Sequence, residues 1–201
     1  MVFPNQITLK ESKRLKTIEQ RQKLKQLKED IFNSNKPIFE VLKKYGFKTV
    51  SEMKEVKTKN NICYFNFRAD AVNKQIHSQV KCPENAIEIG GVNYWAGLEI
   101  VCNRHYKDKK NGVRLFVNYT YKIESIGEKF FVIKDEVEDE RITLNIKMLD
   151  YFKLPYAGTC HSVQGLSIKD EMTLFDVNTP YVDKYFIWTA LTRATDFGGQ
   201  S

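Results

Sequence analysis

The sequence predicts an α/β fold in which a parallel β-sheet flanked by helices is interrupted by a small antiparallel β-barrel. A β-prone run at 62–67 is followed directly by a helical pattern, which is the repeating unit of open α/β sheets. Between residues 86 and 148 the helical pattern gives way to five short β-rich runs. After Pro155 the strand-then-helix order returns, so we expect the two outer segments to form one domain.

These changes of pattern predict the domain boundaries. Residues 1–85 and 151–197 are expected to build the α/β domain, and residues 86–150 the inserted barrel. Residues 198–201 are expected to be a cut end rather than a natural terminus. With 201 residues, of which 42% are hydrophobic, the chain is long enough to bury a sizeable core.

Composition predicts a soluble intracellular protein with no membrane partner. No apolar run reaches the roughly 20 residues that span a bilayer, and Met1 to Gln6 lack the order of a signal peptide. The cytoplasm, the nucleus or a viral replication site would all fit. The four cysteines form no CxxC pair, so we expect reduced thiols and no metal site.

The net charge of +7 is concentrated near the start, where residues 1–60 hold 15 Lys or Arg against 7 Asp or Glu. A basic face favours a polyanionic partner such as nucleic acid through phosphate contacts. A helix surface that merely aids solubility explains the same charges.

The elements follow in order. Apolar residues at helical spacing predict a helix over 17–33 with Thr17 as its N-cap, and a second over 37–45 ended by Gly46. The run 62–67 is a candidate buried strand, with a helix over 69–80 after it. The barrel strands are expected at 98–102, 113–117, 119–126, 129–133 and 141–146. A strand entering Gly158, another over 172–177 and a helix over 185–193 complete the chain.

Two segments carry the most specific signal: Gly158-Thr-Cys-His-Ser-Val-Gln-Gly-Leu-Ser167 and, about 30 residues later, Trp188-Thr-Ala-Leu-Thr-Arg-Ala-Thr195. They resemble motifs V and VI of superfamily 1 helicases of the RecD-like branch. The resemblance implies that Thr159 and His161 hold a nucleic-acid strand. It also implies that Gln164 and Gly165 couple this grip to the nucleotide cleft.

The residue chemistry agrees with this resemblance. A strand that ends in Gly-Thr-x-His presents a hydroxyl, an imidazole and backbone N–H groups at the edge where open α/β sheets bind ligands. A buried turn with a satisfied His161 is the alternative. Arg193 corresponds to the arginine finger of the family, whose fixed guanidinium offsets charge on the γ-phosphate. A surface arginine in an ion pair is the alternative there.

Two weaker matches lie earlier in the chain. Ile7 to Leu15 is similar to helicase motif IV and places Arg14 at the γ-phosphate, although an ordinary solvated arginine fits equally. Cys63 to Asn73 resembles the motif between IV and V, in which a strand is followed by an arginine and, on the helix, an asparagine. Asn66, Phe67 and Arg68 would then meet nucleic acid, and an aromatic ring there could stack on a base. Packing of the phenylalanines in the core remains open.

The resemblance implies a RecA-like domain of the P-loop NTPase type, interrupted by an SH3-like barrel, from the C-terminal motor half of a helicase. The sequence has no GxxxxGK[ST] phosphate-binding loop and no acidic magnesium motif. ATP and Mg²⁺ would be bound mainly by an N-terminal RecA-like domain, and this chain alone would be inactive. The expected partner is single-stranded nucleic acid, DNA rather than RNA.

Two rival functions stay open, a non-catalytic single-strand-binding module and a degenerate helicase scaffold. The Lys-, Asn- and Ile-rich composition suggests an AT-rich genome, such as that of a large DNA virus.

Overall fold

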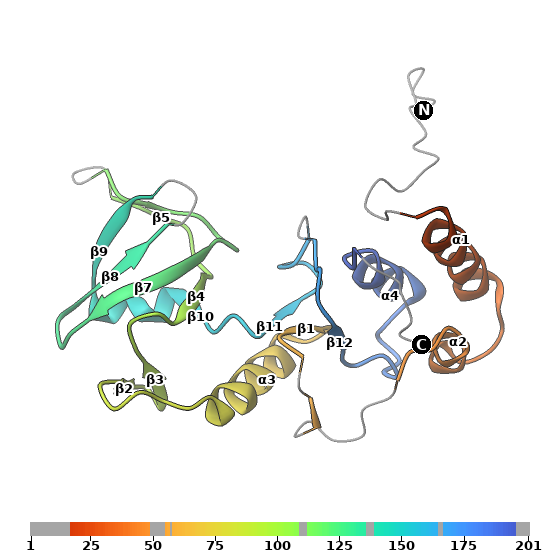
Figure 1. The fold of residues 1–201 in the computed structure, drawn as a ribbon, viewed down its shortest axis with the longest axis horizontal. Coiled ribbons are helices and arrows are strands. Elements are labelled where there is room, and N and C mark those ends of the chain that lie inside the picture. The colour runs from red at the N-terminus through yellow and green to blue at the C-terminus, as the bar shows by residue number, and fades with distance from the viewer. Residues whose placement is uncertain are drawn as a thin grey trace, which may run out of the picture.

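The computed structural model describes residues 17–48, 55–56, 58–108, 112–135, 139–164 and 167–195. They form two units that lie side by side (Figure 1). The α/β unit comprises the described residues up to Gln79 and from Ala157 onward, and the β unit comprises residues 87–153. This arrangement confirms the expected mixture of a small parallel sheet with an antiparallel insertion.

The α/β unit is built on a three-stranded parallel sheet with strand order β11-β1-β12. The strands are short: β1 is Asn60–Cys63, β11 is Ala157–Thr159 and β12 is Met172–Leu174. Because all three strands are parallel, their carboxyl ends meet at one edge of the sheet. The segments that follow Cys63, Thr159 and Leu174 therefore lie at the same edge.

Four helices accompany this sheet: α1 (Ile18–Asn33), α2 (Ile38–Lys44), α3 (Asn66–Gln79) and α4 (Lys184–Leu191). Thr17 is the N-cap of α1, as predicted, and its hydroxyl accepts the N–H of Gln20 at 3.1 Å. The apolar stripe of α1 packs on α4, where Leu27 and Ile31 share a buried cluster with Ile187. The spacing of the apolar residues thus predicted both the helix and its buried face.

The strand expected over 62–67 is shorter than predicted, since β1 ends at Cys63 and α3 begins at Asn66. The backbone N–H groups of Tyr64 and Phe65 donate to the Asp176 carboxylate, at 3.1 and 3.4 Å, instead of to a neighbouring strand. This long-range contact turns the chain into the helix three residues before the expected start at Ala69. No local pattern of the sequence could reveal it.

The β unit contains a five-stranded antiparallel sheet with order β10-β4-β7-β8-β9. Its strands are β4 (Glu99–Cys102), β7 (Thr120–Ile126), β8 (Phe130–Lys134), β9 (Arg141–Asn145) and β10 (Phe152–Lys153). Two small hairpins, β2 (Ile87–Ile89) with β3 (Val92–Tyr94) and β5 (Tyr106–Lys107) with β6 (Arg114–Leu115), stand beside it. A 3-10 helix, η2 (Ile146–Tyr151), connects β9 to β10.

The five predicted β-rich runs all fall on strands of this unit. Within the described residues the sheet is open, because β9 and β10 are its two edges and are not paired with each other. β10 pairs with β4, which extends the antiparallel sheet past residue 150.

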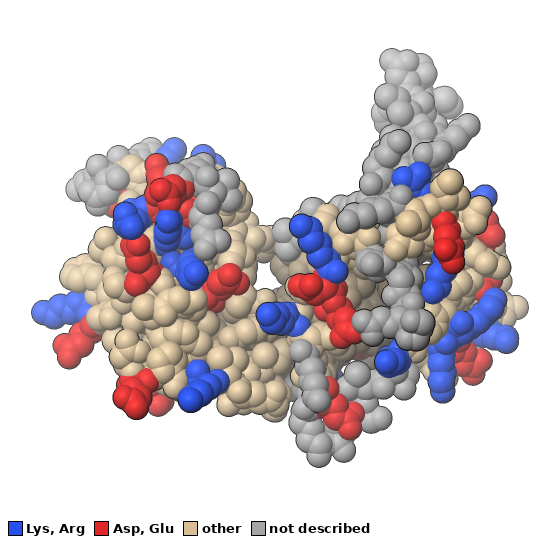
Figure 2. All heavy atoms as spheres, viewed as in Figure 1, with Lys and Arg blue, Asp and Glu red and all other residues tan. Residues whose placement is uncertain are grey.

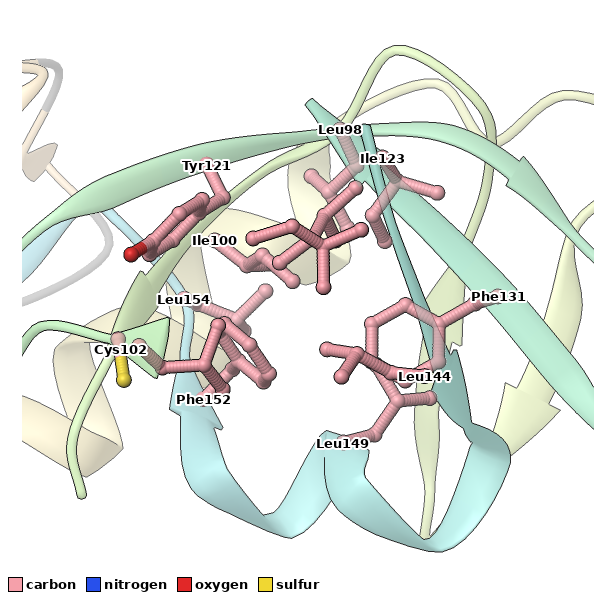
Figure 3. Packing of buried hydrophobic residues seen from close by; sticks show 13 residues of the cluster. Leu98, Ile100, Cys102, Tyr121, Ile123, Phe131, Leu144, Leu149, Phe152 and Leu154 are labelled. Atoms are coloured by element: carbon pink, nitrogen blue, oxygen red, sulfur yellow. The ribbon is translucent and has the colours of Figure 1, made fainter. Parts of the chain in front are cut away.

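Alternating apolar residues form a single core inside the β unit (Figure 3). Tyr121 and Ile123 of β7 point inward while Lys122 is exposed, which is the period-two pattern of a half-buried strand. Phe131 meets Phe152 edge to face, with ring centroids 5.9 Å apart. Of the barrel aromatics, Tyr121 fills the core, and its hydroxyl accepts the N–H of Phe116 at 3.2 Å.

Helix α3 ties the segment that returns from the β unit into the parallel sheet. The buried Asn73 carboxamide accepts the N–H groups of Tyr156 and Ala157, at 3.0 and 2.9 Å, and donates to the Ala157 carbonyl at 2.9 Å. One turn later, His77 stacks on Trp95 with ring centroids 5.1 Å apart. A single helix thus fixes how the strand β11 enters the sheet.

On the outer surface, Lys and Arg side chains over α1 and α2 alternate with Asp and Glu side chains (Figure 2). The described helices include none that is both long and apolar enough to cross a membrane.

Candidate functional site: the carboxyl edge of the parallel sheet

The candidate site is the edge of the parallel sheet where β1, β11 and β12 end. The segment after β11 holds the first helicase-like motif, with Thr159 as the last residue of the strand. The segment after β1 holds Asn66, Phe67 and Arg68 in the first turn of α3. The structure therefore brings two of the predicted groups to one edge, which the sequence separates by about 90 residues.

The turn after β11 is held by its own hydroxyl groups. The Ser162 hydroxyl donates to the Thr159 carbonyl at 2.8 Å, and the Val163 N–H donates to the same carbonyl at 3.1 Å. Gly158 lies so close to this turn that a Cβ atom on it would come within 2.6 Å of the Ser162 hydroxyl oxygen. A side chain at this position would push the Ser162 hydroxyl away from the Thr159 carbonyl, so a glycine favours the observed hydrogen bond.

The predicted strand-holding side chains have different environments. His161 is exposed, which excludes the alternative of a buried, satisfied histidine. Thr159 is half-buried, and its hydroxyl lies 3.4 Å from the Ser162 N–H that donates to it. Gln164 is exposed, while Gly165 lies outside the described residues.

The second helicase-like motif begins inside α4, which ends at Leu191, two residues before Arg193. The expected helix over 185–193 is thus shorter than predicted. The Arg193 side chain turns back along the helix, and its Nε donates to the Thr189 carbonyl at 3.1 Å. A cation next to the last carbonyls of a helix is stabilised by the helix dipole, which explains this position.

The structure joins the two motifs through Ile168. Its N–H donates to the Arg193 carbonyl at 2.8 Å, and its carbonyl accepts the Thr195 N–H at 2.9 Å. Ile168 and Ala194 form a parallel β-bridge. Burial raises the pKa of the Cys160 thiol, and the Arg193 guanidinium acts in the opposite direction.

Aromatic rings cover the edge beside the β1–α3 junction. Phe67 is 64% exposed and stacks on Phe65, with centroids 5.1 Å apart and planes tilted by 22°. Tyr181 is 70% exposed and meets Phe65 edge to face at 6.1 Å. Phe67 is therefore not a core residue, and most of it is open to solvent.

Asp176 is the buried charge of this edge, and sequence reasoning missed it. Only 2% of its side chain is exposed. Besides the two backbone N–H groups of the β1–α3 junction, its carboxylate accepts the Nε–H of Arg68 at 3.1 Å. The only available signal was an acidic residue shortly after a strand, which is too common to single out.

A cleft of about 280 Å³ lies between the parallel sheet and the β unit. Asn66, Thr159 and Ser162 line it on one side, and Asn118 and Thr120 line it on the other. These five side chains are uncharged donors and acceptors, which suit the sugar and base edges of a nucleic acid.

The remaining predicted site residue is Arg14, and the remaining question is whether a metal could bind. Arg14 lies outside the described residues. Among the residues that are described, no group of three or more His, Cys, Asp or Glu side chains could hold a metal ion.

Comparison with solved structures identifies proteins that have a similar fold. The Pif1 helicase from Bacteroides, in a complex with ADP-AlF3 and single-stranded DNA, matches with a TM-score of 0.58 and 11% identity, over 92% of this chain and 48% of that one. The chain shares its fold with part of the Pif1 helicases. A second Pif1 structure, from a study of DNA unwinding at forked duplexes, matches with a TM-score of 0.58, 13% identity and coverage of 92% and 46%.

The Pif1 helicase from Candida albicans matches with a TM-score of 0.55 and 10% identity, over 90% of this chain and 53% of that one. The chain thus spans about half the length of the structures that it matches. No protein-family model and no curated protein sequence matches it.

Proposed function

We propose that this chain is the C-terminal motor region of an ATP-dependent DNA helicase, which grips single-stranded DNA at the carboxyl edge of its parallel sheet. The main support for the proposal is that backbone hydrogen bonds at Ile168 connect the two helicase-like motifs. The fold that contains them is shared with part of the Pif1 helicases. A stand-alone binding module has no need for an arginine-bearing segment that is hydrogen-bonded to its strand-binding loop.

The strand-gripping role rests on the chemistry of the edge. His161 is exposed, Thr159 lies beside it, and the turn that carries both is fixed by Ser162 and Gly158. Such a rigid arrangement can position donors on phosphate and sugar oxygens without ordering a loop at the moment of binding. Phe67 adds an exposed aromatic ring that can stack on a base.

The proposed catalytic role belongs to Arg193, with Arg14 as a second cation for the γ-phosphate. An arginine supplied to ATP from another domain makes hydrolysis depend on the closure of the two domains. In the free chain, Nε of Arg193 donates to the Thr189 carbonyl, so the finger would have to leave the end of α4 when ATP is bound. Gln164 and Gly165, which belong to the first motif, would transmit that movement to the strand.

The remaining parts follow from the same proposal. ATP would lie between this domain and an N-terminal RecA-like domain of the same polypeptide. The described residues offer no ligand cluster for Mg²⁺, so its binding is assigned to that other domain. We assign the β unit to the SH3-like insertion of a RecA-like domain that is expected over residues 1–85 and 151–197.

The proposal is tested by fluorescence anisotropy of a labelled single-stranded oligonucleotide, with unlabelled duplex as the competitor. The wild-type chain should prefer the single strand, and His161→Ala and Thr159→Ala should each weaken binding. Lys129→Ala, a change to a solvent-exposed cation of the β unit, is the control for net charge. Equal affinity for duplex, or binding that neither motif variant changes, would exclude the strand grip and favour a scaffold.

The proposed catalytic role of Arg193 has to be tested in a longer polypeptide that includes the N-terminal RecA-like domain. There, Arg193→Lys should lower the ATP turnover rate by about 10³-fold or more, because lysine lacks the planar fork of the arginine. Binding of the strand in the absence of ATP should be unchanged.

A further inference from the structure

The buried carboxylate of Asp176 lies at the proposed strand-binding edge. Its φ is +63°, a left-handed conformation in which Asp and Asn are enriched among the non-glycine residues. Its side chain is 2% exposed and accepts three N–H groups, from Tyr64, Phe65 and Arg68.

The same contact decides what Arg68 can do. Its Nε is bound to the carboxylate, and its guanidinium carbon lies 5.8 Å from the centre of the Phe67 ring. The charge of Arg68 is therefore balanced by Asp176 within one hydrogen bond. An arginine that is already paired contributes little net charge to a phosphate, because the Asp176 carboxylate at 3.1 Å offsets the Arg68 cation.

The contacts of the Phe67 ring also depend on residues that Asp176 binds. Phe67 lies on Phe65 on one side and has the Arg68 guanidinium nearby, while 64% of the residue remains exposed. The Asp176 carboxylate contacts the residues on both sides of Phe67, since it accepts the backbone N–H of Phe65 and the Nε–H of Arg68. The whole β1–α3 junction is thus aligned by one carboxylate from the segment after β12.

We propose that Asp176 is the positioning residue of a base-stacking platform formed by Phe67 on Phe65, and that it keeps Arg68 from acting as a phosphate contact. The proposal rests on the proposed function and refines it, since the ligand at this part of the edge is a nucleobase rather than the phosphate backbone. Stacking is tolerant of sequence and only weakly dependent on salt, whereas each phosphate contact releases counterions.

The test is a salt series of single-strand binding with the wild-type chain and Asp176→Asn. Asparagine tolerates the left-handed conformation and keeps an oxygen for the two backbone N–H groups, so this variant should fold. It releases Arg68, which can then bind one phosphate. We expect the plot of log affinity against log salt concentration to steepen by about 0.7, the value for one additional contact to a single strand.

Two further variants identify the source of the change. Arg68→Gln in the Asp176→Asn background should restore the wild-type slope. Glu124→Gln also removes a carboxylate that is bound to an arginine, but it lies in the β unit, where Arg141 binds it at 2.6 and 2.8 Å. It changes the net charge equally and should leave the slope as it is.

A second readout separates positioning from charge. Phe67→Ala should weaken binding by the wild-type chain by roughly 5- to 150-fold, the range for losing one stacked base. In the Asp176→Asn background the same change should cost less, because the Arg68 guanidinium is no longer held 5.8 Å from the centre of the ring. The Nε–H signal of Arg68 in a nitrogen-15 NMR spectrum should shift on Asp176→Asn without any nucleic acid present.

The outcomes are distinguishable. A wild-type chain that does not bind the strand overturns the proposed function and this refinement together. A wild-type chain that binds, with the slope and the cost of Phe67→Ala both unchanged by Asp176→Asn, overturns the role of Asp176 alone.

Discussion

The two units of the molecule are held together in different ways. The β unit has one continuous apolar core to which all five strands of its main sheet contribute. In the α/β unit the buried apolar residues fall into three smaller clusters around strands of only three or four residues. Its alignment depends on buried polar groups instead, namely Asn61, Asn73 and Asp176.

The difference matches the proposed division of labour. Apolar packing is non-directional and yields a rigid block, whereas hydrogen bonds to buried amides and carboxylates fix particular backbone groups at particular points. The edge that carries Thr159, Phe67 and Arg193 needs such points. We infer that the β unit is the more stable part and that the α/β unit is the more precisely positioned one.

The largest expected effect is in the β unit. Phe131→Ala removes a fully buried ring that packs on Phe152, and should lower the free energy of unfolding of this unit by about 3–5 kcal/mol. The two buried cysteines report the units separately, because Cys102 lies in the β unit and Cys63 in the α/β unit. Thiol labelling followed by mass spectrometry should show faster labelling of Cys102, with that of Cys63 unchanged.

A smaller effect is expected from Asn73→Ala in the α/β unit. It leaves two N–H groups and one carbonyl of residues 156 and 157 without the partner that now satisfies them. The cost should be about 1–3 kcal/mol, the penalty for a buried polar group that loses its hydrogen bond. Labelling of Cys63, whose pKa burial raises to about 12, should accelerate while that of Cys102 does not. If either substitution accelerates the labelling of both thiols equally, the two units unfold together. The inferred difference in stability between them would then be wrong.

The smallest effect is expected on acidification. Hydrogen bonds from Lys44 and Tyr45 lower the pKa of Asp30 in the α/β unit, and one from Arg141 lowers that of Glu124 in the β unit. A carboxyl whose pKa is lowered by folding stabilises the fold above its unfolded pKa, and this contribution is lost as the pH falls through the folded value. Asp30→Asn should therefore reduce the acid sensitivity of Trp188 fluorescence, which reports the α1–α4 contact. Glu124→Gln should not affect it.

Much of the candidate site could be predicted from the sequence, because its motifs are local. Thr159 and His161 lie on one short segment, and their position at the end of a strand follows from the neighbouring residues. The orientation of Arg193 could not be predicted, since it depends on where α4 ends and on the Thr189 carbonyl. Asp176 could not be identified either, because its partner Arg68 is 108 positions away in the sequence.

The sequence by itself determined the α/β character, the placement of the antiparallel insertion and the helix that begins at Thr17. These depend on periodicity and capping, which are interactions between residues a few positions apart. Only the tertiary structure decided where β1 stops, that β10 pairs with β4, and that one carboxylate holds the β1–α3 junction. Those features depend on contacts between distant segments, whose hydrogen bonds override the local preference for a longer strand.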